Sequence, residues 1–230
     1  MYVTVPPLDF DAYCALPGSG SGPGVLVFQE IFGVNANIRG IADRLADGGF
    51  VALVPDMFWR IERRFERNDE SGMAEAFAMV QKFDFQTAAE DITAAHSYLR
   101  DMPECTGKVG AMGFCLGGAL AFLAATSSRV DGRGPEAVVC YYGSAINGML
   151  DQADRIDAPV LFHYGSRDPY IPEDNIAEVE QAVGGKPGVE FYRYDAGHAF
   201  SNWDAPSMYD EAATAEAWPR TIDFLSRHLL

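Results

Sequence analysis

Short apolar runs alternate with segments of helical hydrophobic spacing along most of this chain. The apolar runs are bounded by glycine, proline and polar residues, as is typical of buried strands, and they cover residues 24–28, 50–54, 108–112, 137–142, 159–164 and 189–194. Between them, apolar positions recur every three to four residues and predict helices over residues 37–47, 71–82, 85–100, 172–183 and 207–228. Two further strand-like segments, 2–5 and 10–15, precede the first of these runs.

The alternation of strands and helices predicts a mostly parallel central sheet, because helical crossovers between successive strands are right-handed and cover both faces of the sheet. The expected fold class is α/β, a three-layer α/β/α sandwich in which the two earliest strands are candidates for antiparallel pairing. The chain has 230 residues, 48% of them hydrophobic, which is enough for one large core. No internal repeat is present, and the Gly- and Ser-rich stretch 18–24 lies too near the start of the chain to divide domains. We expect a single domain over residues 1–230.

A glycine-rich turn follows the apolar run 108–112 and reads Gly-Phe-Cys-Leu-Gly-Gly over residues 113–118. A strand that enters a helix through Gly-x-Cys-x-Gly is typical of the nucleophile elbow, with cysteine where most such turns have serine. The glycines are needed because side chains at these positions would collide with the neighbouring strand and helix. The N-terminal helix dipole at this point favours a thiolate on Cys115. Since free cysteines are often simply buried, the motif predicts a catalytic thiol only if an acid and a histidine accompany it.

An acid and a histidine follow later strands at corresponding places. Asp168 ends a Gly-Ser-Arg-Asp turn directly after one predicted strand, and His198 comes shortly after the next. Because the carboxyl ends of parallel strands meet at one edge of the sheet, we expect both side chains beside Cys115. The chain order nucleophile, acid, histidine is that of the α/β-hydrolases and differs from the chymotrypsin and subtilisin orders. Asp174 and Asp195 are rival acids, but neither lies in a strand-end Gly-x-x-Asp turn.

Charge and cysteine content argue against several classes of function. The net charge of −16 repels phosphate backbones and anionic membrane surfaces, so we expect neither nucleic acid nor membrane as a partner. No apolar run could cross a bilayer and no basic segment followed by an apolar one begins the chain, so a cytoplasmic location is expected. The four cysteines form no CxxC pair and no zinc-like cluster with histidine, so we expect no metal site and no cofactor. Cys14 and Cys140 lie in strand-like runs and are expected in the core, whereas Cys105 carries no signal in a turn.

Several short motifs surround the elbow, the acid and the histidine. They are Gln-Glu-Ile-Phe-Gly at 29–33, Pro-Asp at 55–56, the elbow at 113–118, Gly-Ser-Arg-Asp at 165–168 and Gly-His-Ala-Phe at 197–200. On these motifs the chain resembles the dienelactone hydrolase (carboxymethylenebutenolidase) family of the α/β-hydrolases over nearly its whole length. The resemblance implies hydrolysis of a small-molecule ester or lactone by a Cys115, His198 and Asp168 triad. We expect a monomer or a small homo-oligomer.

The resemblance also implies roles for residues near the thiol. Cys115 would attack the carbonyl carbon while His198 holds the proton and Asp168 fixes the imidazole tautomer. Glu30 would be an additional catalytic carboxylate that hydrogen-bonds the resting thiol and takes its proton when substrate arrives. The backbone N–H groups of Leu116 and Ile31 would form the oxyanion hole. A solvated end-of-strand carboxylate is the alternative for Glu30, but its place before a glycine-containing loop at the active edge favours the catalytic interpretation.

Aromatic residues near the predicted active edge are candidates for the substrate pocket. The first candidates are Tyr142, Trp59 and Phe32. Further candidates for the pocket wall are Phe58, Ser144 and Trp203. Plain packing explains Tyr142 and Ser144 equally well. Of the remaining histidines, His163 is expected in the core. His96 and His228 are expected on helices, with no partner in view.

The chain departs from the family where substrate charge is recognised. Members that act on dienelactone hold its carboxylate with two arginines, one a few residues after the catalytic histidine and one on the helical segment before the elbow. Here the corresponding stretches, 199–202 and 71–77, contain no arginine. Unless Arg60, Arg63 or Arg64 folds over the site, a buried carboxylate would lack a partner at a cost on the order of several kcal/mol. These arginines belong to a mixed-charge segment typical of a solvated, salt-bridged face, which comprises Arg60, Glu62, Arg63, Arg64, Glu66, Arg67 and Asp69.

Two other functions are compatible with these residues. One is a general carboxylesterase or thioesterase of the same fold. The other, from a different class, is a small-molecule binder that keeps the pocket without catalysis. The binder is disfavoured because it would not need a nucleophile, a base and an acid together.

Overall fold

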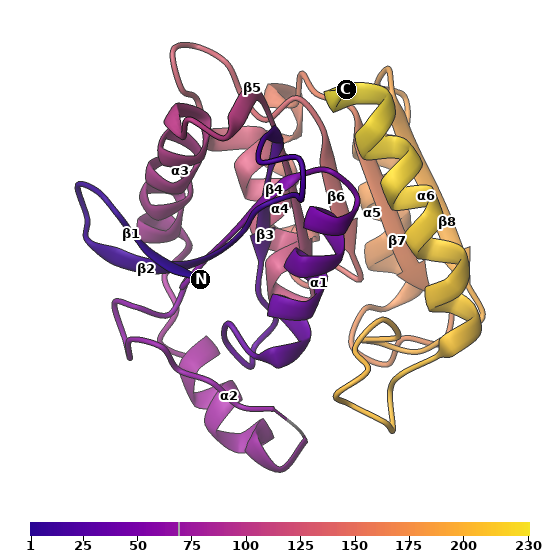
Figure 1. Cartoon of the computed structure of the whole chain (residues 1–230). Helices are drawn as coiled ribbons and strands as arrows, with labels where there is room; N and C mark the ends of the chain where they lie inside the picture. Colours follow the sequence, from indigo (N-terminus) through magenta and orange to yellow (C-terminus); the bar gives the residue numbers. More distant parts are fainter. Residues whose placement is uncertain (69) are drawn as a thin grey trace.

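An eight-stranded sheet forms the middle layer of the protein, with the strand order β1-β2-β4-β3-β5-β6-β7-β8 (Figure 1). The computed structural model describes residues 1–68 and 70–230. The strands are β1 (Tyr2–Val5), β2 (Phe10–Ala15), β3 (Gly22–Phe28), β4 (Val51–Pro55), β5 (Cys105–Phe114), β6 (Val138–Tyr141), β7 (Val160–Gly165) and β8 (Val189–Tyr194). β2 pairs antiparallel with β1 and β4, while the pairings from β4 through β8 are parallel. The predicted mostly parallel sheet with antiparallel first strands is confirmed.

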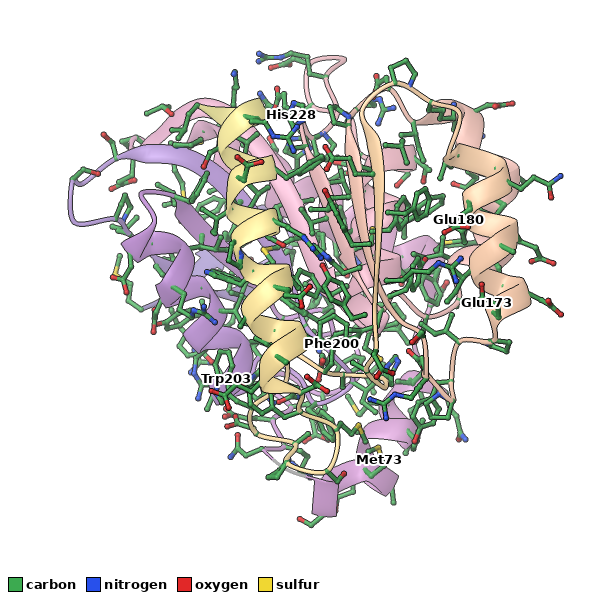
Figure 2. All side chains as sticks on the ribbon, turned by 90° about the vertical axis from the view of Figure 1, so that its right-hand side faces the viewer. Met73, Glu173, Glu180, Phe200, Trp203 and His228 are labelled. Carbon is green, nitrogen blue, oxygen red and sulfur yellow. The ribbon has the colours of Figure 1, made fainter. Side chains whose placement is uncertain are left out.

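Helices cover both faces of this sheet. The helices are α1 (Ala36–Asp47), α2 (Met73–Val80), α3 (Phe85–Asp101), α4 (Leu116–Ser127), α5 (Glu173–Val183) and α6 (Glu211–Leu229). α1 and α6 lie on one face, and α3 and α4 pack on the other together with the 3₁₀ stretch η2 (Ile146–Arg155) and α5 (Figure 2). The predicted three-layer α/β/α sandwich is confirmed. Among the described residues, no helix has the length and apolar content needed to cross a membrane.

Burial follows the position of each element in the three layers. Every residue of β3, β4 and β6 is buried, as expected for parallel strands with helices on both faces, whereas the edge strand β8 is mostly half-buried. α4 is buried around nearly its whole circumference because β5, β6, α3 and η2 all pack against it. A helix in that position needs small and apolar residues on every side, which explains its Ala-rich sequence. Cys14 and Cys140 are buried in the core, as predicted.

Several element boundaries differ from the sequence-based expectations. The predicted helix 71–82 is a short 3₁₀ turn, η1 (Glu70–Gly72), followed by α2. Cys105, expected in a turn, begins β5, whose first residues pair with the start of β3. The last helix begins at Glu211 rather than 207, because Asp210 caps it by accepting a hydrogen bond from the Ala213 N–H. η2 was not predicted, since 3₁₀ geometry does not follow the 3.6-residue hydrophobic period. Asp69 of the mixed-charge segment lies outside the described residues.

The parallel topology places the candidate residues at one edge of the sheet. Glu30 follows β3, Cys115 follows β5 and Tyr142 follows β6, while Asp168 and His198 follow β7 and β8. All of these strands run in the same direction, so their carboxyl ends gather at one side of the molecule. α2 lies beyond this edge, outside the three layers (Figure 1).

Candidate active site

Cys115 stands on a strained turn between β5 and α4. Its backbone has φ of 55° and ψ of −116°, a conformation that a residue with a side chain rarely adopts. The turn is tight because the chain reverses against itself: a Cβ at Gly113 would lie 2.0 Å from the carbonyl oxygen of Gly117. A Cβ at Gly117 would lie 2.2 Å from the carbonyl oxygen of Phe28. The two glycines therefore make the elbow possible, as the sequence predicted.

The acid and the histidine are hydrogen-bonded to each other beside this turn. Nδ1 of His198 lies 2.7 Å from Oδ2 of Asp168, and both side chains are almost completely buried. The other oxygen of Asp168 accepts the backbone N–H groups of Tyr170 and Ile171 at 2.8 and 3.1 Å, which fixes the carboxylate. This arrangement leaves Nε2 of His198 for the reaction.

The electrostatic surroundings of His198 favour its charged form. Burial opposes the charge, but the neighbouring Cys115 and the hydrogen bond with Asp168 outweigh it and raise the pKa of His198 to about 11. The rival acids lie elsewhere. Asp195 pairs with Arg167 at 2.7 Å, and Asp174 is exposed in the first turn of α5.

Glu30 is buried within a hydrogen-bond network rather than solvated. Only 3% of the residue is exposed. Its Oε1 accepts the Tyr142 hydroxyl at 3.1 Å, and its Oε2 accepts the side-chain amide of Asn202 at 2.6 Å. Burial raises the pKa of Glu30, although attraction to His198 and the hydrogen bonds from Asn202 and Tyr142 oppose this shift. The solvated alternative for Glu30 is therefore wrong.

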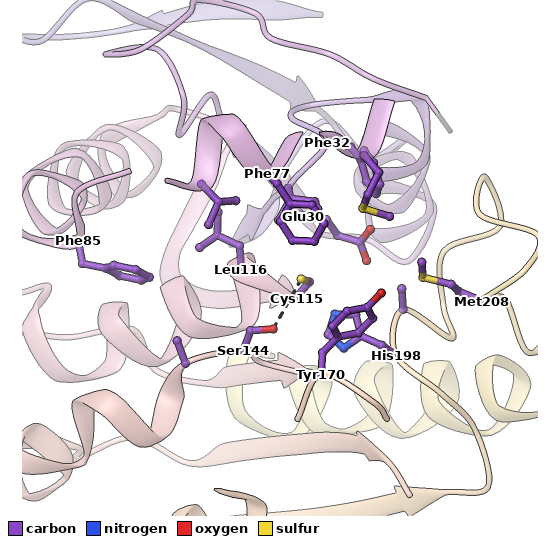
Figure 3. A pocket seen from close by; sticks show the side chains of 15 residues that line it. Glu30, Phe32, Phe77, Phe85, Cys115, Leu116, Ser144, Tyr170, His198 and Met208 are labelled. Atoms are coloured by element: carbon purple, nitrogen blue, oxygen red, sulfur yellow. Dashed lines mark hydrogen bonds between the residues drawn. The ribbon is translucent and has the colours of Figure 1, made fainter. Parts of the chain in front are cut away.

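The expected hydrogen bond between the resting thiol and Glu30 is not among the hydrogen bonds of the described residues. The Sγ atom of Cys115 instead lies 3.7 Å from Oγ of Ser144 (Figure 3). Cys115 also acts on His198 electrostatically, because it contributes to the raised pKa of the imidazole. His198 is thus electrostatically linked both to Cys115 and to the Glu30 carboxylate.

Two backbone N–H groups expected to form the oxyanion hole border the thiol. Leu116 is the first residue of α4, where a backbone N–H has no acceptor within the helix. Ile31 directly follows Glu30, and both Leu116 and Ile31 line the cavity that contains Cys115. Their role as oxyanion-hole donors stays a prediction.

A largely apolar cavity of about 200 Å³ opens at Cys115 (Figure 3). Its walls come from the loop after β3, from α2 and the residues that follow it, and from the loops after β6, β7 and β8. The apolar side chains that line it are Ile31, Phe32, Met73, Phe77, Val80, Phe85, Leu116, Ala145, Ala199 and Met208. Its polar lining consists of Glu30, Cys115, Ser144, Tyr170 and His198. Of the expected pocket residues, Phe32 and Ser144 lie in this lining.

Comparison with known proteins identifies the family. The model of the dienelactone hydrolase family matches residues 10–229. The chain belongs to this family. The carboxymethylenebutenolidase of Pseudomonas sp. strain P51 is 36% identical to it, with 95% of this chain and 90% of that protein covered. Carboxymethylenebutenolidase 1 of Cupriavidus pinatubonensis is 33% identical, with 94% of this chain and 91% of that protein covered.

Solved structures of the same family have the same fold. A proposed dienelactone hydrolase from Klebsiella pneumoniae subsp. pneumoniae superposes with a TM-score of 0.83 at 27% identity, covering 98% of this chain and 97% of that one. A dienelactone hydrolase-like promiscuous phosphotriesterase from metagenomic libraries superposes with a TM-score of 0.81 at 28% identity, covering 100% and 98%. The chain is thus an α/β-hydrolase of the dienelactone hydrolase family, whose members cleave ester or lactone bonds.

Three arginines of the mixed-charge segment were considered as partners for a substrate carboxylate. Each of them is bound to another part of the protein. Arg60 makes a two-point salt bridge with the buried carboxylate of Asp91. Arg63 donates to the backbone carbonyl of Asp9 at 2.9 Å, and Arg64 pairs with Asp11 at 2.7 Å. Among the described residues that line the cavity, none is an arginine or a lysine.

Three of the aromatic candidates serve packing instead of the cavity wall. Trp59 donates its indole N–H to Asp91 at 2.9 Å and stacks on Phe10, so the expectation that it lines the pocket is wrong. Trp203 packs against Gly40 of α1, and Phe58 packs in the core. Each of these side chains thus packs onto a neighbouring element and not into the cavity.

Tyr142 lies behind the cavity lining, where it hydrogen-bonds Glu30. It is fully buried, with its hydroxyl on Glu30 and its ring 5.2 Å from that of His198. Tyr142 is not among the described residues that line the cavity, so the expectation that it lines the pocket is wrong.

Asn202 is a site residue that sequence reasoning missed. It lies four residues after His198, in the stretch where an arginine was sought and not found. Its amide orientation is fixed because its Oδ1 accepts the backbone N–H of Asp204 at 3.0 Å, which leaves the amide nitrogen for Glu30. The available signal in the sequence was an amide residue in the loop after the last strand, close to the histidine.

Two of the remaining histidines, His163 and His96, have hydrogen-bond partners, whereas the buried Nε2 of His228 has none among the described residues. His163 is fully buried between the Tyr194 hydroxyl at 2.8 Å and Thr221 at 3.0 Å, and burial lowers its pKa to about 3. It is a satisfied core histidine, as predicted. His96, for which no partner was expected, hydrogen-bonds Ser128 at 2.9 Å and lies 3.2 Å from Arg100. Within the described parts of the chain, no group of three or more His, Cys, Asp or Glu residues is arranged to hold a metal ion.

Proposed function

We propose that this protein hydrolyses uncharged esters or lactones with an apolar acyl part, through a Cys115 nucleophile, a His198 proton carrier and an Asp168 that orients the imidazole. The observation that supports this most is the buried 2.7 Å bond between His198 and Asp168 beside the strained Cys115 elbow. The thiol opens into a cavity with apolar walls. Nucleophile, base and orienting acid are thus supplied together with a binding space.

Acylation would begin as Cys115 gives its proton to His198, whose raised pKa favours the imidazolium. Sγ forms a bond to the carbonyl carbon, and the negative charge on the carbonyl oxygen is stabilised by the N–H groups of Leu116 and Ile31. The carbon–oxygen bond to the leaving group then breaks. His198 gives its proton to the leaving oxygen, so that an alcohol departs and a thioester remains.

Deacylation would reverse the proton movement. A water molecule loses one proton to His198 and its oxygen forms a bond to the thioester carbon. The carbon–sulfur bond breaks, which releases a carboxylic acid and restores the thiolate and imidazolium pair. Asp168 keeps the imidazole in one tautomer and stabilises its cation in both halves of the reaction.

Glu30 is included in this proposal as an additional catalytic carboxylate. Its attraction to His198 supports a role in the proton balance of the site, because a negative charge there stabilises the imidazolium. The role expected from the family, acceptance of the thiol proton as substrate arrives, stays a prediction. Tyr142 and Asn202 would position the carboxylate through their hydrogen bonds.

The alternative activities share this site. A general carboxylesterase or a thioesterase would use the same nucleophile and differ only in the preferred leaving group. The cytoplasmic location and the monomeric or small oligomeric state expected from the sequence also stay predictions.

The test replaces each cysteine in turn and measures hydrolysis of a panel of small aryl esters, lactones and thioesters. Cys115→Ala should abolish turnover, with a loss on the order of 10⁶ in kcat. Cys14→Ala, Cys105→Ala and Cys140→Ala are matched controls and should leave kcat within a few-fold. If Cys115→Ala kept more than about a tenth of the wild-type kcat, a barrier change of only ~1.4 kcal/mol, the assignment would fail. Tight binding with no turnover by wild-type protein across the panel would instead favour the binder.

A further inference from the structure

A second cavity, of about 360 Å³, meets the first at the candidate catalytic histidine. Tyr170, His198 and Met208 line both cavities. Figure 3 shows Tyr170 next to His198, with Met208 on the far side of the histidine from Ser144. The ring of Tyr170 packs edge-on against His198 at 5.2 Å between centroids, and 56% of this tyrosine is exposed. These side chains form a shared border between two separate spaces.

The two cavities differ in which reacting groups they contain. Cys115, Ile31 and Leu116 line the first cavity and are absent from the described lining of the second. The acyl carbon must bond to the sulfur and its oxygen must face the two N–H donors, so the acyl part belongs in the first cavity. The leaving oxygen must receive its proton from His198, which lines both spaces. A leaving group that departs past His198 therefore enters the second cavity.

The second cavity is also more polar than the first. Besides the three shared side chains, its lining includes Arg167, Pro169, Ser207, Tyr209 and Asp210. The two charged side chains there already have partners. Arg167 holds the side chain of Asp195 at 2.7 Å and the Asp195 backbone carbonyl at 2.6 Å, and Asp210 accepts the Ala213 N–H at 2.9 Å. Because Arg167 is ion-paired and Asp210 caps the positive N-terminus of α6, this surface offers hydrogen-bonding groups that suit a polar, uncharged group.

We propose that this second cavity is the leaving-group subsite and that it takes a polar, uncharged alcohol. The inference rests on the proposed esterase function and deepens it. The preferred substrate is an open-chain ester. Its apolar acyl group lies in the first cavity next to Cys115, and its hydroxyl-bearing alcohol group lies in the second cavity on the other side of His198. A lactone has its acyl carbon and its alcohol oxygen in the same ring and occupies only the first cavity.

The test compares two esters of the same medium-chain acid, the ethyl ester and the 2,3-dihydroxypropyl ester. Wild-type enzyme should prefer the dihydroxypropyl ester in kcat/KM by about fivefold to tenfold, the discrimination of one or two hydrogen bonds between neutral groups. Arg167→Ala and Tyr209→Ala should reduce this preference toward one. Both variants should affect the rate of thioester hydrolysis in single-turnover experiments less than they affect acylation by the dihydroxypropyl ester, because the alcohol has left before that step.

Phe77→Ala is the matched control in the first cavity. It should alter kcat/KM for both esters equally, since the acyl group is the same, and it should also change the rate of thioester hydrolysis. Equal kcat/KM for the two esters in wild-type enzyme would overturn the subsite, as would a preference that survives both second-cavity variants. If hydrolysis of both esters depended on Cys115 and yet showed no preference, only the subsite would be wrong. Hydrolysis that did not depend on Cys115 would instead remove the proposed function and the subsite together.

Discussion

The side-chain amide of Asn202 donates a 2.6 Å hydrogen bond to Oε2 of Glu30 across 172 positions of sequence. Both residues are almost fully buried, so the bond links the loop after β8 to the end of β3 in a place without solvent screening. Asn202 stands in the stretch where dienelactone-hydrolysing relatives are expected to carry a cation. A neutral amide compensates a buried carboxylate less than a cation does, in agreement with the raised pKa of Glu30.

Glu30→Gln should lower kcat by about 10²- to 10⁴-fold, the usual loss when a general base is removed. The amide fits the network, because its oxygen can accept from Asn202 while its NH₂ group donates to the Tyr142 oxygen. The loss therefore reports the missing charge and not a collapsed site. Steady-state kinetics with an activated uncharged ester provide the measurement. An unchanged kcat would show that Glu30 only anchors the loop that carries Ile31.

The same variant should affect stability in a pH-dependent way. Because burial raises the pKa of Glu30 in the folded protein, its ionisation is less favourable there than in the unfolded chain. At neutral pH the ionisation of Glu30 lowers the free energy of the unfolded state more than that of the folded state. The thermal midpoint of Glu30→Gln should therefore be equal to or higher than that of wild type. Below the unfolded pKa of about 4.3 both states are protonated and the advantage should disappear. Thermal melts at pH 7 and pH 4 test this, and a lower midpoint for the variant at pH 7 would contradict it.

Asn202→Leu should move the acid limb of the kcat/KM profile to higher pH. The amide hydrogen bond lowers the pKa of Glu30, so its removal raises that pKa, and the active carboxylate is lost at a higher pH. Tyr142→Phe removes the other donor and should shift the limb in the same direction. In the Glu30→Gln background neither substitution should move the limb, because the titrating group is gone. A shift that persisted in that background would assign the limb to another group.

Uncharged esters should have kcat/KM at least equal to that of carboxylate-bearing analogues of similar size. The described cavity lining has no arginine or lysine, and Arg60, Arg63 and Arg64 are engaged with Asp91, Asp9 and Asp11. Phe77→Arg places a cation in this lining and should raise kcat/KM for the carboxylated ester by about twofold to fivefold at low ionic strength, with the gain reduced by salt. A wild-type preference for the carboxylated ester that was lost on replacing Arg60, Arg63 or Arg64 would show that the arginine segment closes over the site.

His163 should make the protein sensitive to mild acid. Burial lowers its pKa to about 3 in the folded state, so between that value and the ordinary value of 6.5 the unfolded chain binds the extra proton. Stability should fall as pH decreases through this window. His163→Gln can still bond to Tyr194 or Thr221 and should show a smaller fall in thermal midpoint between pH 7 and pH 5. Equal falls in both proteins would mean that another group controls the acid limb of stability.

Local sequence was sufficient for the elements and for the order of the candidate catalytic residues. Strand and helix periods, and the glycines of the elbow, are determined by contacts within a few residues of one another. That is why the α/β alternation and the strained turn at Cys115 could be predicted. The parallel topology then brought Asp168 and His198 to the same edge without any detail of side-chain packing.

Only the tertiary structure decided what each side chain at that edge does. The sequence placed Trp59 and Tyr142 near the pocket, but the fold directs the indole to Asp91 and the phenol to Glu30. It also pairs the arginines of the mixed-charge segment with acids and carbonyls from β2, α3 and the turn before β2. The hydrogen bond from Asn202 to Glu30 likewise depends on the tertiary structure. Such pairings depend on how segments far apart in the chain pack against each other, and no local period of hydrophobic and polar residues records that packing.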